Sequence, residues 1–185
     1  MATPSDDILR ARAQWSASGH PRPDAIAIPG PDQESVWSFP RPPRVERCIH
    51  PVRVLFGGEV IAQSAAALRL LETSHPPTYY VPPNDVVWDR LARAGGSSMC
   101  EWKGVARYWT VRVGDRVAER AAWSYPDPFD DFAALADHVA FYCAAMDACF
   151  VGGERAEPQP GGFYGGWITR HVVGPFKGGP GTNGW

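Results

Sequence analysis

The most informative stretch of this 185-residue chain is residues 100–128, which read CEWKGVARYWTVRVGDRVAERAAWSYPDP. Near its centre lies Val113-Gly114-Asp115-Arg116, which is typical of a tight hairpin with a two-residue loop. Gly and Asp accept the positive φ angles that match such a loop to the twist of its strands. The resulting register pairs Val113 with Arg116, Thr110 with Glu119, Tyr108 with Ala121, Ala106 with Trp123, and Gly104 with Tyr125.

Side chains alternate between the two faces of a strand, so this register predicts which residues share a face. One face carries Trp102, Gly104, Ala106 and Tyr108 against Tyr125, Trp123 and Ala121. Small residues alternate there with aromatic ones, which predicts a shallow hollow walled by rings and suited to a planar ligand. On the other face Trp109 is expected opposite Arg120, where cation–π stacking needs no ligand.

Length and composition favour one globular domain with extensions. The chain is 44% apolar and 21% charged, and its formal net charge of -2 disfavours binding to a nucleic-acid polymer. No apolar run is long enough to span a membrane, and residues 1–7 are acidic where a secretory signal is basic and then apolar. We therefore expect a cytoplasmic protein with reduced cysteines and no membrane partner.

Three regions follow from the distribution of proline and glycine. Residues 1–43 are expected to form an N-terminal helix that ends at Gly19, followed by a proline-rich arm. Residues 44–155 form the β domain. Residues 156–185 are a Gly/Pro-rich tail whose aromatic side chains predict that it packs on the domain or on a partner subunit, so a homo-oligomer through this tail or the N-terminal helix is one possibility.

Within the β domain, short alternating segments are separated by turn signals. The expected strands are residues 45–56 paired with 59–62, then 68–72, 78–81, the central hairpin, and 138–142 paired with 147–151. Residues 84–91 and 130–136 are expected to be short helical segments, and Gly95-Gly96-Ser97-Ser98 a turn. This pattern predicts a mainly β, antiparallel fold.

Four segments resemble a bacterial family of domains of unknown function, DUF427: LETSHPPTYY at residues 71–80, CEWKG at 100–104, AWSYP at 122–126 and HVAFY at 138–142. The family is catalogued under a nucleotidyltransferase name and has no assigned activity. Its fold is similar to the β-tent of methionine sulfoxide reductase B, a thiol enzyme with structural zinc, and of domains that cage a cyclic amide among tryptophans. The resemblance thus implies a β-tent-like domain. This chain lacks the paired Cys-x-x-Cys zinc ligands, and we predict no metal and no cofactor.

The candidate catalytic residues are Cys100, Glu72 and Lys103. An ammonium near Cys100 would favour its thiolate, although an inert buried cysteine is the alternative. Lys103 is expected on the face opposite Trp102 unless the strand bends near Gly104. Glu72, with His75, is placed to act as a general acid or base, or else to pair with an arginine.

Our leading hypothesis is a domain that binds a small planar or nucleotide-like ligand. The predicted ligand-binding residues are Glu72, Tyr79, Trp102, Lys103, Tyr108, Trp123, Tyr125 and Phe141. The first alternative is an enzyme of nucleotidyltransferase type or with thiol-dependent chemistry at Cys100, although no Asp-x-Asp pair follows the Gly-Ser turn. The second is a structural or assembly protein whose aromatic residues are only core.

Overall fold

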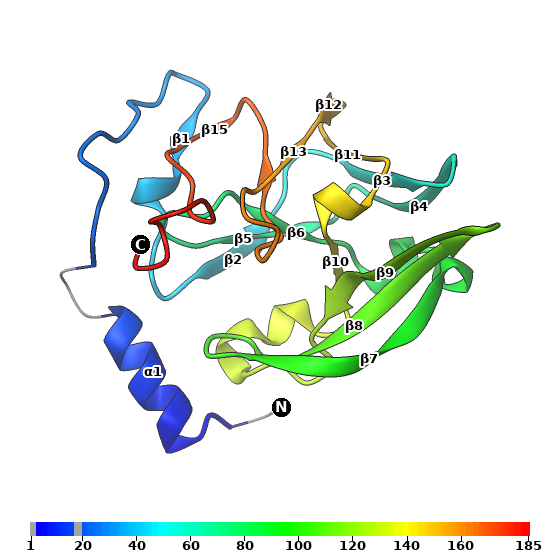
Figure 1. The fold of residues 1–185 in the computed structure, drawn as a ribbon, viewed down its shortest axis with the longest axis horizontal. Coiled ribbons are helices and arrows are strands. Elements are labelled where there is room, and N and C mark those ends of the chain that lie inside the picture. The colour runs from blue at the N-terminus through cyan, green and yellow to red at the C-terminus, as the bar shows by residue number, and fades with distance from the viewer. Residues whose placement is uncertain (1–2, 17–19) are drawn as a thin grey trace.

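The computed structural model describes residues 3–16 and 20–185, and most of its regular structure is strand (Figure 1). The predicted end of the first helix at Gly19 lies outside the described residues. The helix is α1 (Asp6–Ser16), and the strands are β1 (Glu34–Ser35), β2 (Arg44–Arg47), β3 (Val52–Phe56), β4 (Glu59–Ser64), β5 (Leu68–Leu71), β6 (Thr78–Tyr80), β7 (Leu91–Cys100), β8 (Gly104–Val113), β9 (Arg116–Ser124), β10 (Val139–Phe141), β11 (Ala148–Val151), β12 (Glu154–Arg155), β13 (Glu157–Pro158), β14 (Trp167–Ile168) and β15 (Val172–Val173). Short 3₁₀ helices occupy Val36–Ser38, Pro83–Asp85, Trp88–Arg90, Asp130–Leu135 and Cys143–Ala145.

The strands of the described ranges form several linked sheets. Two are four-stranded, in the orders β10-β9-β8-β7 and β12-β11-β3-β4, and one is three-stranded, β2-β5-β6. The short pair β13–β14 is antiparallel like the larger sheets, and β1–β15 is parallel. A bridge between Val81 and Val139 joins the end of β6 to β10. The prediction of a mainly β, antiparallel fold is confirmed.

Local turn chemistry explains the centre of the long β8–β9 hairpin, which runs along the lower right of Figure 1. Gly114 has a φ of +54°, and Val113 pairs with Arg116 as expected. Further from the turn the register differs from the prediction. Val111 pairs with Ala118 but Trp109 pairs with Ala122, so β9 contains two extra residues at a bulge where Arg120 has a φ of +49°.

The bulge changes which side chains meet. Tyr108 lies opposite Trp123 instead of Ala121, and Trp109 lies opposite Ala122 instead of Arg120. Because the shift is by an even number of residues, Trp123 keeps its predicted face, whereas Ala121 joins the main core. The predicted contact of Trp109 with Arg120 is wrong: the Arg120 guanidinium lies 3.9 Å from the centroid of the Tyr108 ring.

Three strand predictions are also corrected. Residues 45–56 are two strands, with β2 paired to β5 and β3 paired to β4. Residues 95–98 lie within β7, whose pairing with β8 shifts between Arg93 and Ser97. Strand β10 pairs with β9, and β11 pairs with β3, so the predicted pairing of 138–142 with 147–151 is wrong. All of β10 is buried, and such a strand needs neighbours from distant parts of the chain.

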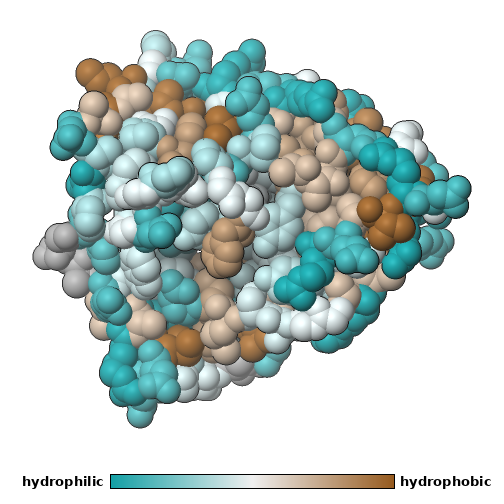
Figure 2. All heavy atoms as spheres, viewed as in Figure 1, coloured by the Kyte–Doolittle hydropathy of each residue, from teal (hydrophilic) through white to brown (hydrophobic). Residues whose placement is uncertain are grey.

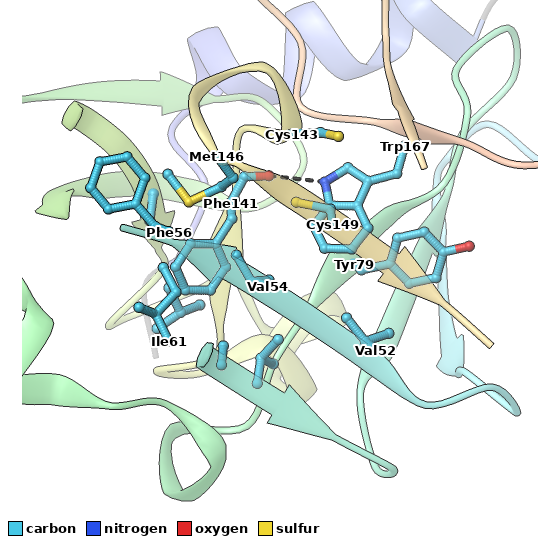
Figure 3. Packing of buried hydrophobic residues seen from close by; sticks show 14 of the residues in the cluster. Val52, Val54, Phe56, Ile61, Tyr79, Phe141, Cys143, Met146, Cys149 and Trp167 are labelled. Atoms are coloured by element: carbon cyan, nitrogen blue, oxygen red, sulfur yellow. Dashed lines mark hydrogen bonds between the residues drawn. The ribbon is translucent and has the colours of Figure 1, made fainter. Parts of the chain in front are cut away.

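The main core lies between the two four-stranded sheets, and β14 of the tail contributes to it (Figure 3). Val52 and Val54 of β3 are fully buried because alternate residues of this strand face inward. Trp167 of β14 is 1% exposed, and its indole nitrogen donates a hydrogen bond to the carbonyl of Phe141 at 2.9 Å. The tail is therefore part of the core.

A smaller cluster joins the N-terminal arm to the end of the chain. Trp37 packs edge-on against Trp185, and its indole nitrogen donates to the carbonyl of Pro175 at 2.8 Å. Leu71 of β5 and Val172 of β15 belong to the same cluster. The arm and the tail thus pack together against the end of β5, the central strand of the three-stranded sheet.

The surface facing the viewer in Figure 1 is mixed in character. Figure 2 shows hydrophilic residues around most of its edge and hydrophobic ones in small separate groups. Isolated apolar residues are ordinary on a protein surface and do not indicate a docking site. No helix in residues 3–16 or 20–185 has the length and apolarity to cross a bilayer.

Candidate functional site

A pocket of about 300 Å³ lies where the aromatic face of the β8–β9 hairpin meets β5 and β6. Helix α1, the proline-rich arm and the tail complete its walls. The lining residues from the sheets and their connections are Leu70, Glu72, His75, Pro76, Thr78, Tyr80, Ser98, Met99, Cys100, Glu101, Trp102, Lys103, Ala106, Tyr108, Trp123, Tyr125 and Tyr142, and those from the extensions include Trp15, Arg41, Gln159, Tyr164 and Lys177.

The aromatic walls support one another. Tyr80, 1% exposed, contacts Trp123 edge-on with ring centroids 6.2 Å apart, and Trp123 contacts Tyr142 at 4.5 Å. The hydroxyl of Tyr108 is hydrogen-bonded to Ser98 at 2.7 Å. Rings held by such contacts lose little further freedom when a ligand enters. Ala106, buried beside them, provides the small side chain that leaves the space open.

The turn between β7 and β8 brings Trp102 and Lys103 into the same pocket. Residues 101–103 form the turn, and Gly104 follows with a φ of +97°, a conformation that side chains larger than hydrogen rarely adopt. The condition under which Lys103 was expected to leave the face opposite Trp102, a bend near Gly104, is thus met. Because the chain reverses here, strict strand alternation does not apply to residues 101–103.

Lys103 is a buried cation without a counterion in contact. The residue is 8% exposed, and its Nζ atom lies 5.8 Å from the centroid of the Tyr125 ring. Among the described residues, Nζ has no hydrogen-bond or ion-pair partner. Burial lowers the pKa of Lys103, but Cys100, Tyr125, Tyr80 and Glu72 raise it more, so its pKa lies well above the ordinary value and the amine is charged at neutral pH.

Glu72 lies beside a second cation. Arg41 Nε is 3.6 Å from Glu72 Oε1, and the same guanidinium donates a hydrogen bond to the carbonyl of Thr73 at 3.0 Å. Both side chains are largely buried. The sequence left open whether Glu72 pairs with an arginine or acts as an acid or base, and the structure places the arginine next to it.

His75 lies at the edge of the pocket against Tyr164, with ring centroids 4.7 Å apart. Burial lowers its pKa, so the ring is neutral at pH 7. Its Nδ1 donates to the carbonyl of Thr73 at 3.0 Å, which leaves Nε2 as the unprotonated nitrogen. His75 is thus suited to accept a proton at Nε2, and it does not contribute a positive charge to the pocket at pH 7.

The structure brings together most of the residues predicted from sequence. All three candidate catalytic residues line the pocket, as do Trp102, Tyr108, Trp123 and Tyr125. Tyr79 and Phe141 do not: the ring of Tyr79 lies 5.2 Å from that of Trp167 in the main core, and Phe141 is fully buried there. Neighbours on a strand face opposite ways, so Tyr80 lines the pocket where Tyr79 was expected.

Sequence reasoning missed the residues that close the pocket from outside the β domain. These are Trp15, Arg41, Gln159, Tyr164 and Lys177, together with Tyr80 and Tyr142 inside it. The rings in the glycine-rich tail were a signal that the tail packs somewhere, but not where. Within the described ranges, no three His, Cys, Asp or Glu side chains gather in a way that could hold a metal ion.

Comparison with known families gives one match. A family model described as a domain of unknown function, DUF427, matches residues 44–152. The chain belongs to the DUF427 family. The matched range runs from β2 to the loop after β11 and contains most of the pocket walls, so the DUF427 domain provides the pocket and the extensions cover it. No curated protein matches this DUF427 chain.

Proposed function

We propose that this DUF427 protein binds a small planar molecule in the aromatic pocket. The observation that carries the proposal is a cavity of about 300 Å³ walled by Tyr80, Trp102, Trp123 and Tyr125. Small-molecule pockets begin at roughly this size, and aromatic walls with a few polar groups are typical of them. A purely structural role for these rings would favour a filled interior.

A polar atom in the pocket wall supports the same proposal. Trp102 is 2% exposed, and its indole Nε1 is buried without a hydrogen-bond partner in the described part of the chain. An unsatisfied buried donor costs roughly 1–3 kcal/mol, a cost that an acceptor on a ligand would remove. Trp102 therefore contributes a ring to the wall and carries a buried donor that is unpaired within the described residues.

The test is a thermal-shift screen of nucleotides, cyclic amides, aromatic acids and divalent metals. A ligand that binds only the folded state raises the melting temperature by mass action. Ala106→Phe places a ring in the cavity and should abolish this shift at a stability cost of roughly 1–3 kcal/mol. Ala118→Phe, on the same hairpin but packed towards the main core, is the control and should retain the shift.

Two outcomes contradict the proposal. A full ligand-induced shift in Ala106→Phe would place binding elsewhere, and the absence of any shift with every compound class would argue for a structural role. Circular dichroism of both variants establishes that they are folded.

Cys100 supports a second candidate, thiol-dependent chemistry in the same pocket. It is the cysteine that lines the pocket, and it is partly exposed, whereas Cys48, Cys143 and Cys149 are buried. The ammonium of Lys103, three residues on, interacts electrostatically with it.

A further inference from the structure

The chain contains two lysines, Lys103 and Lys177, and both line the pocket. Their surroundings differ. Lys177 Nζ donates a hydrogen bond to the carbonyl of Trp185 at 2.7 Å and lies 4.6 Å from the centroid of the Trp15 ring. Lys103 Nζ makes no hydrogen bond or ion pair within the described residues, and it lies 5.8 Å from the centroid of the Tyr125 ring. Burying an ammonium without a counterion is costly, so an anion is expected beside Lys103.

The side chains that line the pocket carry one more positive charge than negative charges. Among the side chains that line the pocket the cations are Arg41, Lys103 and Lys177, and the carboxylates are Glu72 and Glu101, so these side chains give a formal sum of 3 − 2 = +1. Arg41 is next to Glu72, and Glu72 also acts on Lys103 and, with Glu101, on Lys177. The two carboxylates are thus shared among three cations, and of these Lys103 is the one without a hydrogen bond within the described residues.

Two neutral donors belong to residues that line the same pocket, Trp102 and Tyr125. The indole Nε1 of Trp102 is buried without a partner in the described ranges. Burial raises the pKa of Tyr125 well above its ordinary value, so its hydroxyl keeps its proton at neutral pH. An ammonium with neutral donors beside it matches the two oxygens of a carboxylate.

We propose that the ligand of this pocket is an aromatic monocarboxylate, with its carboxylate against Lys103 and its ring among Trp102, Trp123 and Tyr80. This rests on the function proposed above and narrows it. A single negative charge balances the excess of +1, whereas a phosphate monoester carries about −1.5 to −2 at pH 7 and would bury surplus charge. We therefore expect the ligand to be an aryl acid rather than a nucleotide.

The decisive experiment compares 2-naphthoate with 2-naphthamide, which have the same rings and differ in charge, and with AMP. Isothermal titration calorimetry of the full chain should give at least about tenfold tighter binding of the acid than of the amide, which corresponds to ~1.4 kcal/mol. Lys103→Met keeps the length of the side chain and should remove this preference. Arg112→Met removes a charge from the exposed side of β8 and should leave the preference unchanged.

Because there are only two lysines, NMR of protein labelled with ¹³C-lysine provides a readout that needs no variant to fold. We expect 2-naphthoate to shift the Lys103 side-chain signal, and 2-naphthamide to leave it near its free position. The assignment follows from the signal that is lost in Lys103→Arg, which keeps the positive charge; the same signal is lost in Lys103→Met.

Each contrary result has a distinct meaning. Equal affinity for acid and amide, or a preference that persists in Lys103→Met, overturns the carboxylate inference while the pocket still binds a planar molecule. Tighter binding of AMP than of 2-naphthoate would overturn the proposal that the ligand carries a single negative charge. Failure of acid, amide and nucleotide alike to bind or to move the Lys103 signal contradicts both this inference and the proposed function.

Discussion

Burial separates the four cysteines into one accessible thiol and three that are enclosed. Burial raises the pKa of the Cys48 thiol, and the hydrogen bond with Cys143, together with burial, raises that of Cys149. The same hydrogen bond from Cys149 lowers the pKa of Cys143, but Cys143 is only 8% exposed. Alkylation requires both thiolate and access, so enclosure slows all three. Cys100 combines a place in the pocket wall with partial exposure.

We expect iodoacetamide at neutral pH to modify Cys100 at least about tenfold faster than the other cysteines, since access limits them. Mass spectrometry of peptides from native protein measures the four rates. An aromatic acid in the pocket should slow the reaction at Cys100 alone. Uniformly slow modification would remove thiol chemistry as a candidate function. The variant Cys100→Ser is the control, because it shows how fast the other three cysteines react.

At the scale of elements, helix α1 lies against the pocket through a few side chains. None of its residues is buried, so apolar burial contributes little to its position. Arg12 instead donates hydrogen bonds to the carbonyls of Glu101 at 2.7 Å and Trp102 at 3.0 Å, and its guanidinium lies 5.0 Å from the centroid of the Phe129 ring. The contact is to the same turn that carries Lys103.

Arg12→Met should therefore release α1 from the β7–β8 turn. We expect amide hydrogen exchange of residues 6–16 to become faster by about tenfold or more, because hydrogen bonds from a charged group contribute roughly 1.5–3 kcal/mol. Arg10→Met is the matched control, since Arg10 pairs with Asp7 on the exposed side of the helix. Similar exchange in wild type and Arg12→Met would show that other contacts hold the helix.

At the scale of the whole molecule, the glycine-rich tail is joined to the main core through one large side chain. Trp167 is almost fully buried, and its indole nitrogen is satisfied by Phe141. Phe163, four residues earlier, is 77% exposed. The same short segment thus carries one ring inside the core and one largely in solvent.

Trp167→Ala should lower the free energy of unfolding by about 3–5 kcal/mol, because it leaves a cavity in the core. Phe163→Ala should change it by less than about 0.5 kcal/mol, as expected for an exposed position. Urea denaturation of both variants measures the difference. Equal small effects would mean that the tail contributes little to the stability of the domain.

Local sequence signals were sufficient for a defined part of this protein. The Gly114-Asp115 turn, the alternation of Ala106 and Tyr108 on one strand, and the Trp123 and Tyr125 pair depend only on turn chemistry and on period two. They predicted the central hairpin and most of the aromatic wall. Short strands bounded by glycine and proline likewise predicted a mainly β fold.

Only the tertiary structure decided the register beyond the bulge, the face on which Tyr79 and Tyr80 lie, and the segments that close the pocket. A bulge of two residues leaves no mark in the alternation pattern, because it preserves the face of the side chains where regular pairing resumes, such as Trp123. The choice between adjacent tyrosines depends on which side of β6 the neighbouring sheet covers. Trp15, Arg41 and Lys177 reach the pocket across long sequence separations, and such contacts arise from the packing of complete elements rather than from local preference.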